Sequence, residues 1–210
     1  QIDDITPPFL RQYMLYLEQT GHNEGGRHAC YRALKTFLYW YEQEVELEGW
    51  SNPIRKVKAP KVPQEYLEPV ELEHIRAMLE ACQKSTFHGC RDRAMLLALL
   101  DTGARAAEFV AIDQDDVNLV SGEIIIRQGK GRKPRTVYLG AKSRKALRAY
   151  LKQRNDTCKA LWVGEDGERL TYWGLRQVIR RRSETARIPE PSLHAFRRAF
   201  ALNCLRNGVD

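Results

Sequence analysis

Hydrophobic positions recur at helical spacing in the first part of the chain. Apolar residues between Leu10 and Leu17 fall at i, i+3, i+4 and i+7, which places them on one face of an α-helix. Thr6 followed by Pro7 is typical of a helix start, because threonine caps free N–H groups and proline suits the first turn. We expect glycines, including Gly25-Gly26, to interrupt the helix before a second helical pattern over residues 31–45.

Prolines change the pattern over residues 49–65. Proline cannot donate a backbone hydrogen bond and breaks helices, so its density here favours extended chain. We therefore predict a helical N-terminal domain over residues 1–54, a linker over 55–65 and a second domain over 66–210. The segment is also basic and holds Pro53, Arg55, Lys56, Lys58, Pro60, Lys61 and Pro63.

The second domain mixes two periodicities. Helical spacing is found over residues 70–79, from about 91 to 100, and over 142–154, 172–185 and 192–207, with Ser192 as an N-cap. Between them, β-branched runs at 117–119, 123–127 and 135–139 are separated by glycine turns. The predicted fold is therefore mainly α with a small antiparallel β-sheet.

Composition excludes several classes of protein. The 210 residues are 43% hydrophobic and 29% charged, and no apolar run approaches the roughly 18 residues that span a bilayer. The five cysteines form no C-x-x-C pair, which argues against a disulfide framework or a zinc ribbon and favours a reducing cytoplasm. Because the chain starts at Gln1 and runs past a helix stop at Asn207-Gly208, we expect it to be part of a longer protein.

Positive charge is concentrated in the second domain. The net charge is +7, and residues 127–154 contain eleven Lys or Arg and no Asp or Glu. Like charges repel unless an anion compensates them, and a nucleic-acid backbone does so with release of counterions; a solvated basic surface is the alternative. Within this run, Gly129-Lys130-Gly131 suggests a lysine at a hairpin tip.

Two further segments could bind phosphate oxygens. Arg105 follows a glycine in an apolar neighbourhood, and Glu108, one helical turn later, could orient it; an internal ion pair is the alternative. His194 and Arg197 share one face of a helix start, where free N–H groups favour anions, although the histidine could instead have a structural capping role. No histidine, cysteine or acidic cluster has spacing suited to zinc or Mg²⁺, so we expect no metal and no cofactor.

The order of three motifs resembles the tyrosine recombinases, the phage-type integrases. These motifs are T-G-A-R-A-A-E over residues 102–108, G-K-G-R-K-P-R over 129–135 and H-A-F-R-R over 194–198. The resemblance implies that the helical domain is a SAM-like core-binding domain and that residues 66–210 are a catalytic domain. It also implies catalytic roles for Arg105, Lys130, His194 and Arg197, with Glu108 in support. Phe196 and Arg198 replace the usual leucine and histidine.

The family reaction is strand cleavage and rejoining through a 3′-phosphotyrosine, which implies site-specific DNA recombination or integration. The family's next histidine or tryptophan and its nucleophilic tyrosine have no counterpart before Asp210, so we expect this chain to bind DNA without cutting it. The resemblance further implies double-stranded DNA as partner, a homo-oligomer such as a synaptic tetramer, and a cytoplasmic, nucleoid-associated protein. We expect DNA contacts from Lys56, Lys58, Lys61, Arg132, Lys133, Arg135 and Arg198.

Other functions are also compatible with these residues. A DNA-binding protein without catalysis could keep the same scaffold, a metal-dependent nuclease would need a divalent cation, and a type IB topoisomerase would share the chemistry without a specific site. The residue types nevertheless suit metal-free transfer, because two arginines can bind the non-bridging oxygens of the transition state.

Overall fold

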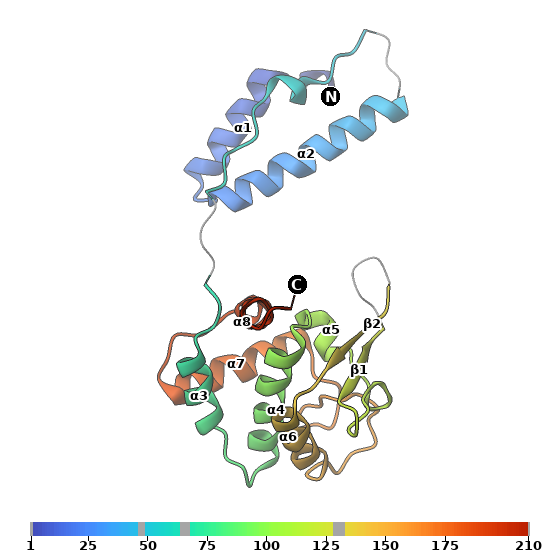
Figure 1. Cartoon of the computed structure of the whole chain (residues 1–210). Helices are drawn as coiled ribbons and strands as arrows, with labels where there is room; N and C mark the ends of the chain where they lie inside the picture. The colour runs from blue at the N-terminus through green and yellow to red at the C-terminus, as the bar shows by residue number, and fades with distance from the viewer. Residues whose placement is uncertain (1, 46–48, 64–67, 128–132, 210) are drawn as a thin grey trace. The chain divides into compact units, whose positions relative to one another are not determined.

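The computed structural model describes residues 2–45, 49–63, 68–127 and 133–209. The chain divides into two compact units, Gln1–Tyr66 and Leu67–Asp210 (Figure 1). Each unit has its own hydrophobic core. The predicted mainly helical fold with one small antiparallel sheet is confirmed.

The first unit is built on two long helices. Its core is formed by residues from both helices and from a short turn that follows them, including Leu10, Tyr31, Leu38, Ile54 and Val57. The helical elements are η1 (Ile2–Asp4), α1 (Pro7–Gln19), α2 (Glu24–Val45) and η2 (Pro53–Lys56). The predicted cap of α1 is present, since the Thr6 hydroxyl accepts a hydrogen bond from the Phe9 N–H.

Two expectations for this unit are wrong. The pair Gly25-Gly26 does not interrupt a helix but lies in the first turn of α2, where the Asn23 side chain accepts a hydrogen bond from the Gly26 N–H at 2.7 Å. Residues 53–56 are not extended chain, because Pro53 starts a 3₁₀ turn that is capped by the buried Asn52 side chain. Proline suits this first position because its missing N–H has no partner there anyway.

The second unit has six helices in the described residues and a two-stranded sheet. Its elements are α3 (Leu72–Glu80), α4 (Phe87–Thr102), α5 (Ala106–Val110), η3 (Gln114–Asp116), β1 (Glu123–Ile126), β2 (Arg135–Tyr138), α6 (Ala141–Leu151), α7 (Tyr172–Ala186) and α8 (Leu193–Arg206). Helix α4 starts earlier than its apolar run because Thr86 caps it by accepting from the Gly89 N–H. Helices α7 and α8 have the predicted bounds to within two residues.

Helix α4 runs through the middle of the second unit and packs against α6 and α8 (Figure 1). Most of its side chains are buried, which explains why its sequence is apolar without a single hydrophobic stripe. An aromatic stack extends the core, with the Trp162 ring between Phe109 at 4.9 Å and Tyr150 at 5.8 Å. The stack thus links α5 and α6 through Trp162.

The sheet is an antiparallel pair in which Glu123 lies opposite Tyr138 and Ile126 opposite Arg135. The third predicted strand, residues 117–119, is not a strand; Val117 makes one isolated bridge to Ile124. The Leu119 carbonyl instead accepts a hydrogen bond from Arg148, and that of Val120 accepts one from Arg144.

Candidate active site

A left-handed turn at the end of α4 positions Arg105. Gly103 ends the helix with φ of 53°, a conformation that favours glycine. A Cβ at this position would lie 2.3 Å from the Phe200 ring of α8, so only glycine allows this contact. Arg105 follows as the N-cap of α5, with 43% of its side chain exposed. The side chain is thus open to solvent although its neighbours in the sequence are apolar.

Glu108 is the acceptor that Arg105 was expected to find. Its carboxylate accepts the Arg105 backbone N–H at 2.8 Å and Nη1 at 3.0 Å. It also accepts two hydrogen bonds from Arg135, from Nη1 at 3.1 Å and Nη2 at 2.7 Å. Burial alone would raise the pKa of Glu108, but the bonds from Arg135 and Arg105 lower it to about 2. The carboxylate is therefore charged at neutral pH and fully hydrogen-bonded.

Arg197 is held close to the same turn. Helix α8 begins at the predicted cap, where the Ser192 hydroxyl accepts a hydrogen bond from the Ala195 N–H. Arg197 lies in the second turn, and its Nη1 donates to the Gly103 carbonyl at 2.5 Å. Because Gly103 is two residues from Arg105, the structure brings the two predicted arginine motifs together.

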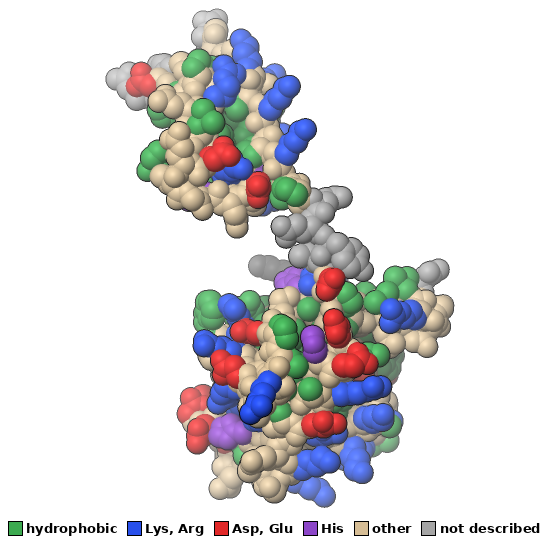
Figure 2. All heavy atoms as spheres, turned by 90° about the vertical axis from the view of Figure 1, so that its left-hand side faces the viewer, with side chains coloured by type: hydrophobic (Ala, Val, Ile, Leu, Met, Phe, Trp, Pro, Cys, Tyr) green, Lys and Arg blue, Asp and Glu red, His purple; other side chains and the backbone are tan. Residues whose placement is uncertain are grey.

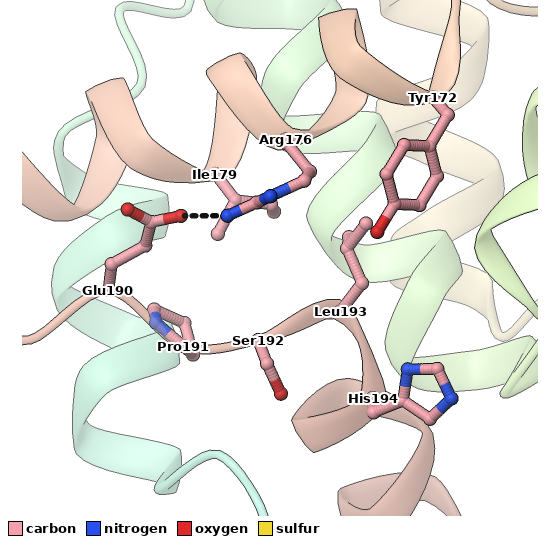
Figure 3. Close-up of a pocket in the computed structure, with 8 residues that line it drawn as sticks. All are labelled: Tyr172, Arg176, Ile179, Glu190, Pro191, Ser192, Leu193 and His194. Carbon is pink, nitrogen blue, oxygen red and sulfur yellow. Dashed lines mark ion pairs between the residues drawn. The ribbon is translucent and has the colours of Figure 1, made fainter. Parts of the chain in front are cut away.

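His194 lies on the first turn of α8 and is exposed. It is at the rim of a pocket of about 310 Å³ between α7 and the segment before α8 (Figure 3). Arg176 of α7 and Glu190 of that segment form an ion pair of 3.9 Å across the pocket. The neighbouring Arg198 is half-buried and donates to the Glu68 carbonyl at 2.9 Å.

The remaining predicted residues fall into three groups. Lys130 and Arg132 lie outside the described residues. Lys133, just before β2, is exposed. In the first unit, Lys56, Lys58 and Lys61 are exposed, and the first two border a groove of about 470 Å³ with an apolar floor.

The basic run 127–154 is less free than its sequence suggests. Of its described residues, five arginines have hydrogen-bond partners within the protein: Arg127 with Asp116, Arg135 with Glu108, Arg154 with Asp156, and Arg144 and Arg148 with backbone carbonyls. The run therefore does not need an external anion for all of its charge, because carboxylates of the protein neutralise part of it. The described lysines of the run are exposed.

Figure 2 shows how the charges are distributed on one face of the protein. On this face of the second unit, Lys and Arg side chains are interspersed with Asp and Glu, whereas basic side chains follow one edge of the first unit. Within the described ranges, no three His, Cys, Asp or Glu side chains are close enough to hold a metal ion. No described helix is long and apolar enough to cross a membrane.

Sequence reasoning missed two connections of this site. Arg135 was expected to contact DNA, and its pairing with Glu108 spans 27 positions, which no local pattern indicates. Asp101 was also missed: its carboxylate accepts a hydrogen bond from the Gly140 N–H at 2.7 Å and another from the Ser143 hydroxyl at the start of α6. The only sign of such a carboxylate in the sequence is that the first N–H groups of a helix, here α6, have no partner within the helix.

Solved structures share this fold. The chain matches a lambda integrase dimer bound to a COC′ core site with a TM-score of 0.78 and 15% identity, covering 99% of this chain and 76% of that one. It matches the crystal structure of the XerA recombinase with a TM-score of 0.62 and 25% identity, covering 100% of this chain and 72% of that one. The fold is thus that of the tyrosine recombinases.

The family follows from the sequence match. Residues 68–210 match the Phage integrase family, and the chain belongs to that family. It is 28% identical over 210 residues to tyrosine recombinase XerA from Thermococcus kodakarensis, covering 99% of this chain and 71% of the relative. It is 29% identical over 221 residues to tyrosine recombinase XerC from Pelotomaculum thermopropionicum, covering 99% and 70%. The resemblance inferred from the three motifs is confirmed.

Proposed function

We propose that this protein is a site-specific DNA recombinase that cleaves and rejoins strands through a 3′-phosphotyrosine. The observation that carries the proposal is the turn at Gly103: Arg105 follows this turn as the N-cap of α5, and Nη1 of Arg197 donates to the Gly103 carbonyl. Two arginines held at one turn, the first of them exposed, suit a single phosphate with two non-bridging oxygens. The family membership of the chain supports the same reaction class.

The reaction divides into defined roles. A tyrosine oxygen attacks the phosphorus, the bond from phosphorus to the 5′-oxygen breaks, and Lys130 donates a proton to that leaving oxygen. Arg105 and Arg197 bind the non-bridging oxygens, where negative charge increases in the transition state. His194 accepts a hydrogen bond or proton on the nucleophile side. The phosphotyrosine retains the energy of the broken bond, so rejoining needs neither a metal nor ATP.

The nucleophile is the role that residues 1–210 leave open. No tyrosine follows Arg197 in the sequence. Tyr150 is buried and accepts a hydrogen bond from the Val163 N–H, Tyr138 ends β2, and Tyr172 begins α7. We propose that none of the three attacks DNA and that residues 1–210 alone bind DNA without cutting it.

DNA binding is proposed to involve both units. The exposed Lys56, Lys58 and Lys61 of the first unit and Lys133 of the second are suited to phosphate contacts, together with Arg132 and Arg198. Each contact releases counterions, so log Kd should change with log salt in proportion to the number of contacts. A slope near zero in a fluorescence-anisotropy titration would contradict this binding mode. A homo-oligomer on DNA, such as a synaptic tetramer in the nucleoid, follows from the same proposal.

The decisive experiment is covalent capture on a suicide substrate, a DNA duplex nicked beside the exchange point. Residues 1–210 should give no protein–DNA adduct on a denaturing gel. Protein expressed to its natural stop codon should give one, and Tyr→Phe at one tyrosine after Arg197 should remove it. If the natural chain has no such tyrosine and forms no adduct, the alternative is correct and the protein binds DNA without catalysis.

A further inference from the structure

The feature that the proposed function does not use is Arg135, the first residue of β2. It lies opposite the buried Ile126 in the register of the sheet. Both terminal nitrogens of its guanidinium donate to the carboxylate of Glu108, one to each oxygen. A two-point contact of this kind fixes both planes and leaves little freedom for either side chain.

Glu108 binds Arg135 and Arg105 with the same two oxygens. Oε1 accepts from Nη1 of both arginines, and Oε2 accepts from Arg135 and from the Arg105 backbone N–H. The side chain of Glu108 is only 6% exposed. Since its position is set by four donors, the carboxylate transmits the position of Arg135 to Arg105.

The charge of the cluster depends on Arg135 as well. Glu108 and Arg105 alone sum to zero, so the carboxylate would cancel much of the attraction that Arg105 has for a phosphate. With Arg135 the three groups sum to +1. A second arginine on the same carboxylate thus restores the positive potential at the exposed guanidinium.

We infer that Arg135 is a positioning residue for the reaction, which neutralises Glu108 and holds it so that Arg105 faces the scissile phosphate with its full charge. This replaces the DNA contact expected for Arg135 from the sequence. The inference rests on the proposed function, because Arg105 acts on a phosphate only if the protein cleaves DNA.

The test compares Arg135→Met and Arg135→Lys with the wild type in protein expressed to its natural stop codon. Arg135→Met should lower the single-turnover cleavage rate by about 10- to 100-fold, somewhat less than loss of a direct transition-state donor. Arg135→Lys should recover part of that rate, since it keeps the charge but not the fork. The salt slope of DNA binding should stay unchanged, whereas loss of a phosphate contact would reduce it by about 1.

A double variant that restores the charge of the cluster separates an effect of charge from an effect of misfolding. In Arg135→Met with Glu108→Gln the cluster again sums to +1, so cleavage should be faster than in Arg135→Met alone. Arg127→Met is the matched control, because it also removes an arginine beside the hairpin that pairs with a buried carboxylate, that of Asp116. The control should cleave at the wild-type rate.

One readout does not need cleavage. In an NMR titration of the carboxyl groups, Arg135→Met should raise the pKa of Glu108 from about 2 towards its ordinary value, and Arg127→Met should not. The inference is overturned by wild-type cleavage in Arg135→Met, by a reduced salt slope, by a double variant no faster than the single one, or by an unshifted Glu108. Wild-type protein that binds DNA but never cleaves it would instead overturn the proposed function. The titration would still show whether Arg135 pairs with Glu108.

Discussion

Two clusters in the second unit each place one carboxylate between two arginines. The Glu108 cluster is Arg105, Glu108 and Arg135, and the Asp92 cluster is Arg91, Asp92 and Arg182. Both sum to +1. In the Asp92 cluster, the side chain of Arg91 is only 2% exposed and that of Arg182 16%, whereas Arg105 and Arg135 are 43% and 34% exposed.

The clusters differ in which acceptors bind the N–H groups of their arginines. Arg91 and Arg182 each bind Asp92 through Nε and Nη2, and each donates Nη1 to a backbone carbonyl, that of Val163 or Ala81 at 3.0 Å. Arg105, by contrast, binds Glu108 through one side-chain nitrogen. An ion pair by itself therefore does not show that an arginine serves only the fold; Arg91 and Arg182 differ from Arg105 in that their remaining nitrogens also bind protein groups.

The largest expected effect is the loss of stability when the buried carboxylate of Asp92 is removed. Asp92→Ala leaves two arginines without their partner inside the protein and should lower the free energy of unfolding by about 3–5 kcal/mol. Glu108→Ala should lower it by only about 1–2 kcal/mol, because Arg105 and Arg135 can turn to water. Urea denaturation followed by circular dichroism measures both. Equal losses of stability would mean that the Glu108 cluster contributes to the fold as much as the Asp92 cluster does, which would contradict the comparison.

The next effect concerns the turn that joins the two arginine motifs. Gly103→Ala places a methyl group against Phe200 at a positive φ, which should cost about 1–3 kcal/mol of stability and slow cleavage by moving the Gly103 carbonyl away from Arg197. Gly21→Ala is the control, because Gly21 has φ of 83° but no atom within 4 Å of the added Cβ. If both variants lose the same stability, contact with Phe200 is not what selects glycine at 103.

A smaller effect appears in the dependence of stability on pH. The pKa of Glu108 is lowered from 4.5 to about 2, so its stabilising contribution is complete above about pH 4.5 and is lost as the pH falls towards 2. We expect this contribution to be about 1–3 kcal/mol. Unfolding free energies at pH 6 and pH 3 should therefore differ more in the wild type than in Glu108→Gln. Parallel pH profiles for the two proteins would contradict the lowered pKa.

Local features of the fold could be read from the sequence because they depend on near neighbours. The caps at Thr6 and Ser192 and the contact between Arg105 and Glu108 involve residues at most three positions apart. Helical spacing alone can bring such groups together. The motifs also indicated the family, because their order along the chain is specific even where single motifs are not.

The remaining features depend on tertiary structure. Glycines at 25 and 26 are tolerated in α2 because Asn23 caps that turn and the helix packs on a core. The basic run is partly neutralised by Asp116 and Glu108, which precede it in the sequence and approach it only in the folded chain. No periodicity encodes such partners. For the same reason, the pairing of Arg135 with Glu108 could not be predicted from the sequence.

The central claim, that Arg105 acts on phosphate while Arg91 serves the fold, is tested most directly by replacing each with lysine in protein expressed to its natural stop codon. Single-turnover cleavage of the nicked substrate and urea denaturation are measured on both variants. Arg105→Lys should cleave about 10²- to 10³-fold more slowly, with stability within about 0.5 kcal/mol of the wild type. Arg91→Lys should lose stability but cleave at the wild-type rate under conditions where it is folded. Wild-type cleavage by Arg105→Lys, or a folded Arg91→Lys that binds DNA without cleaving it, would contradict the account.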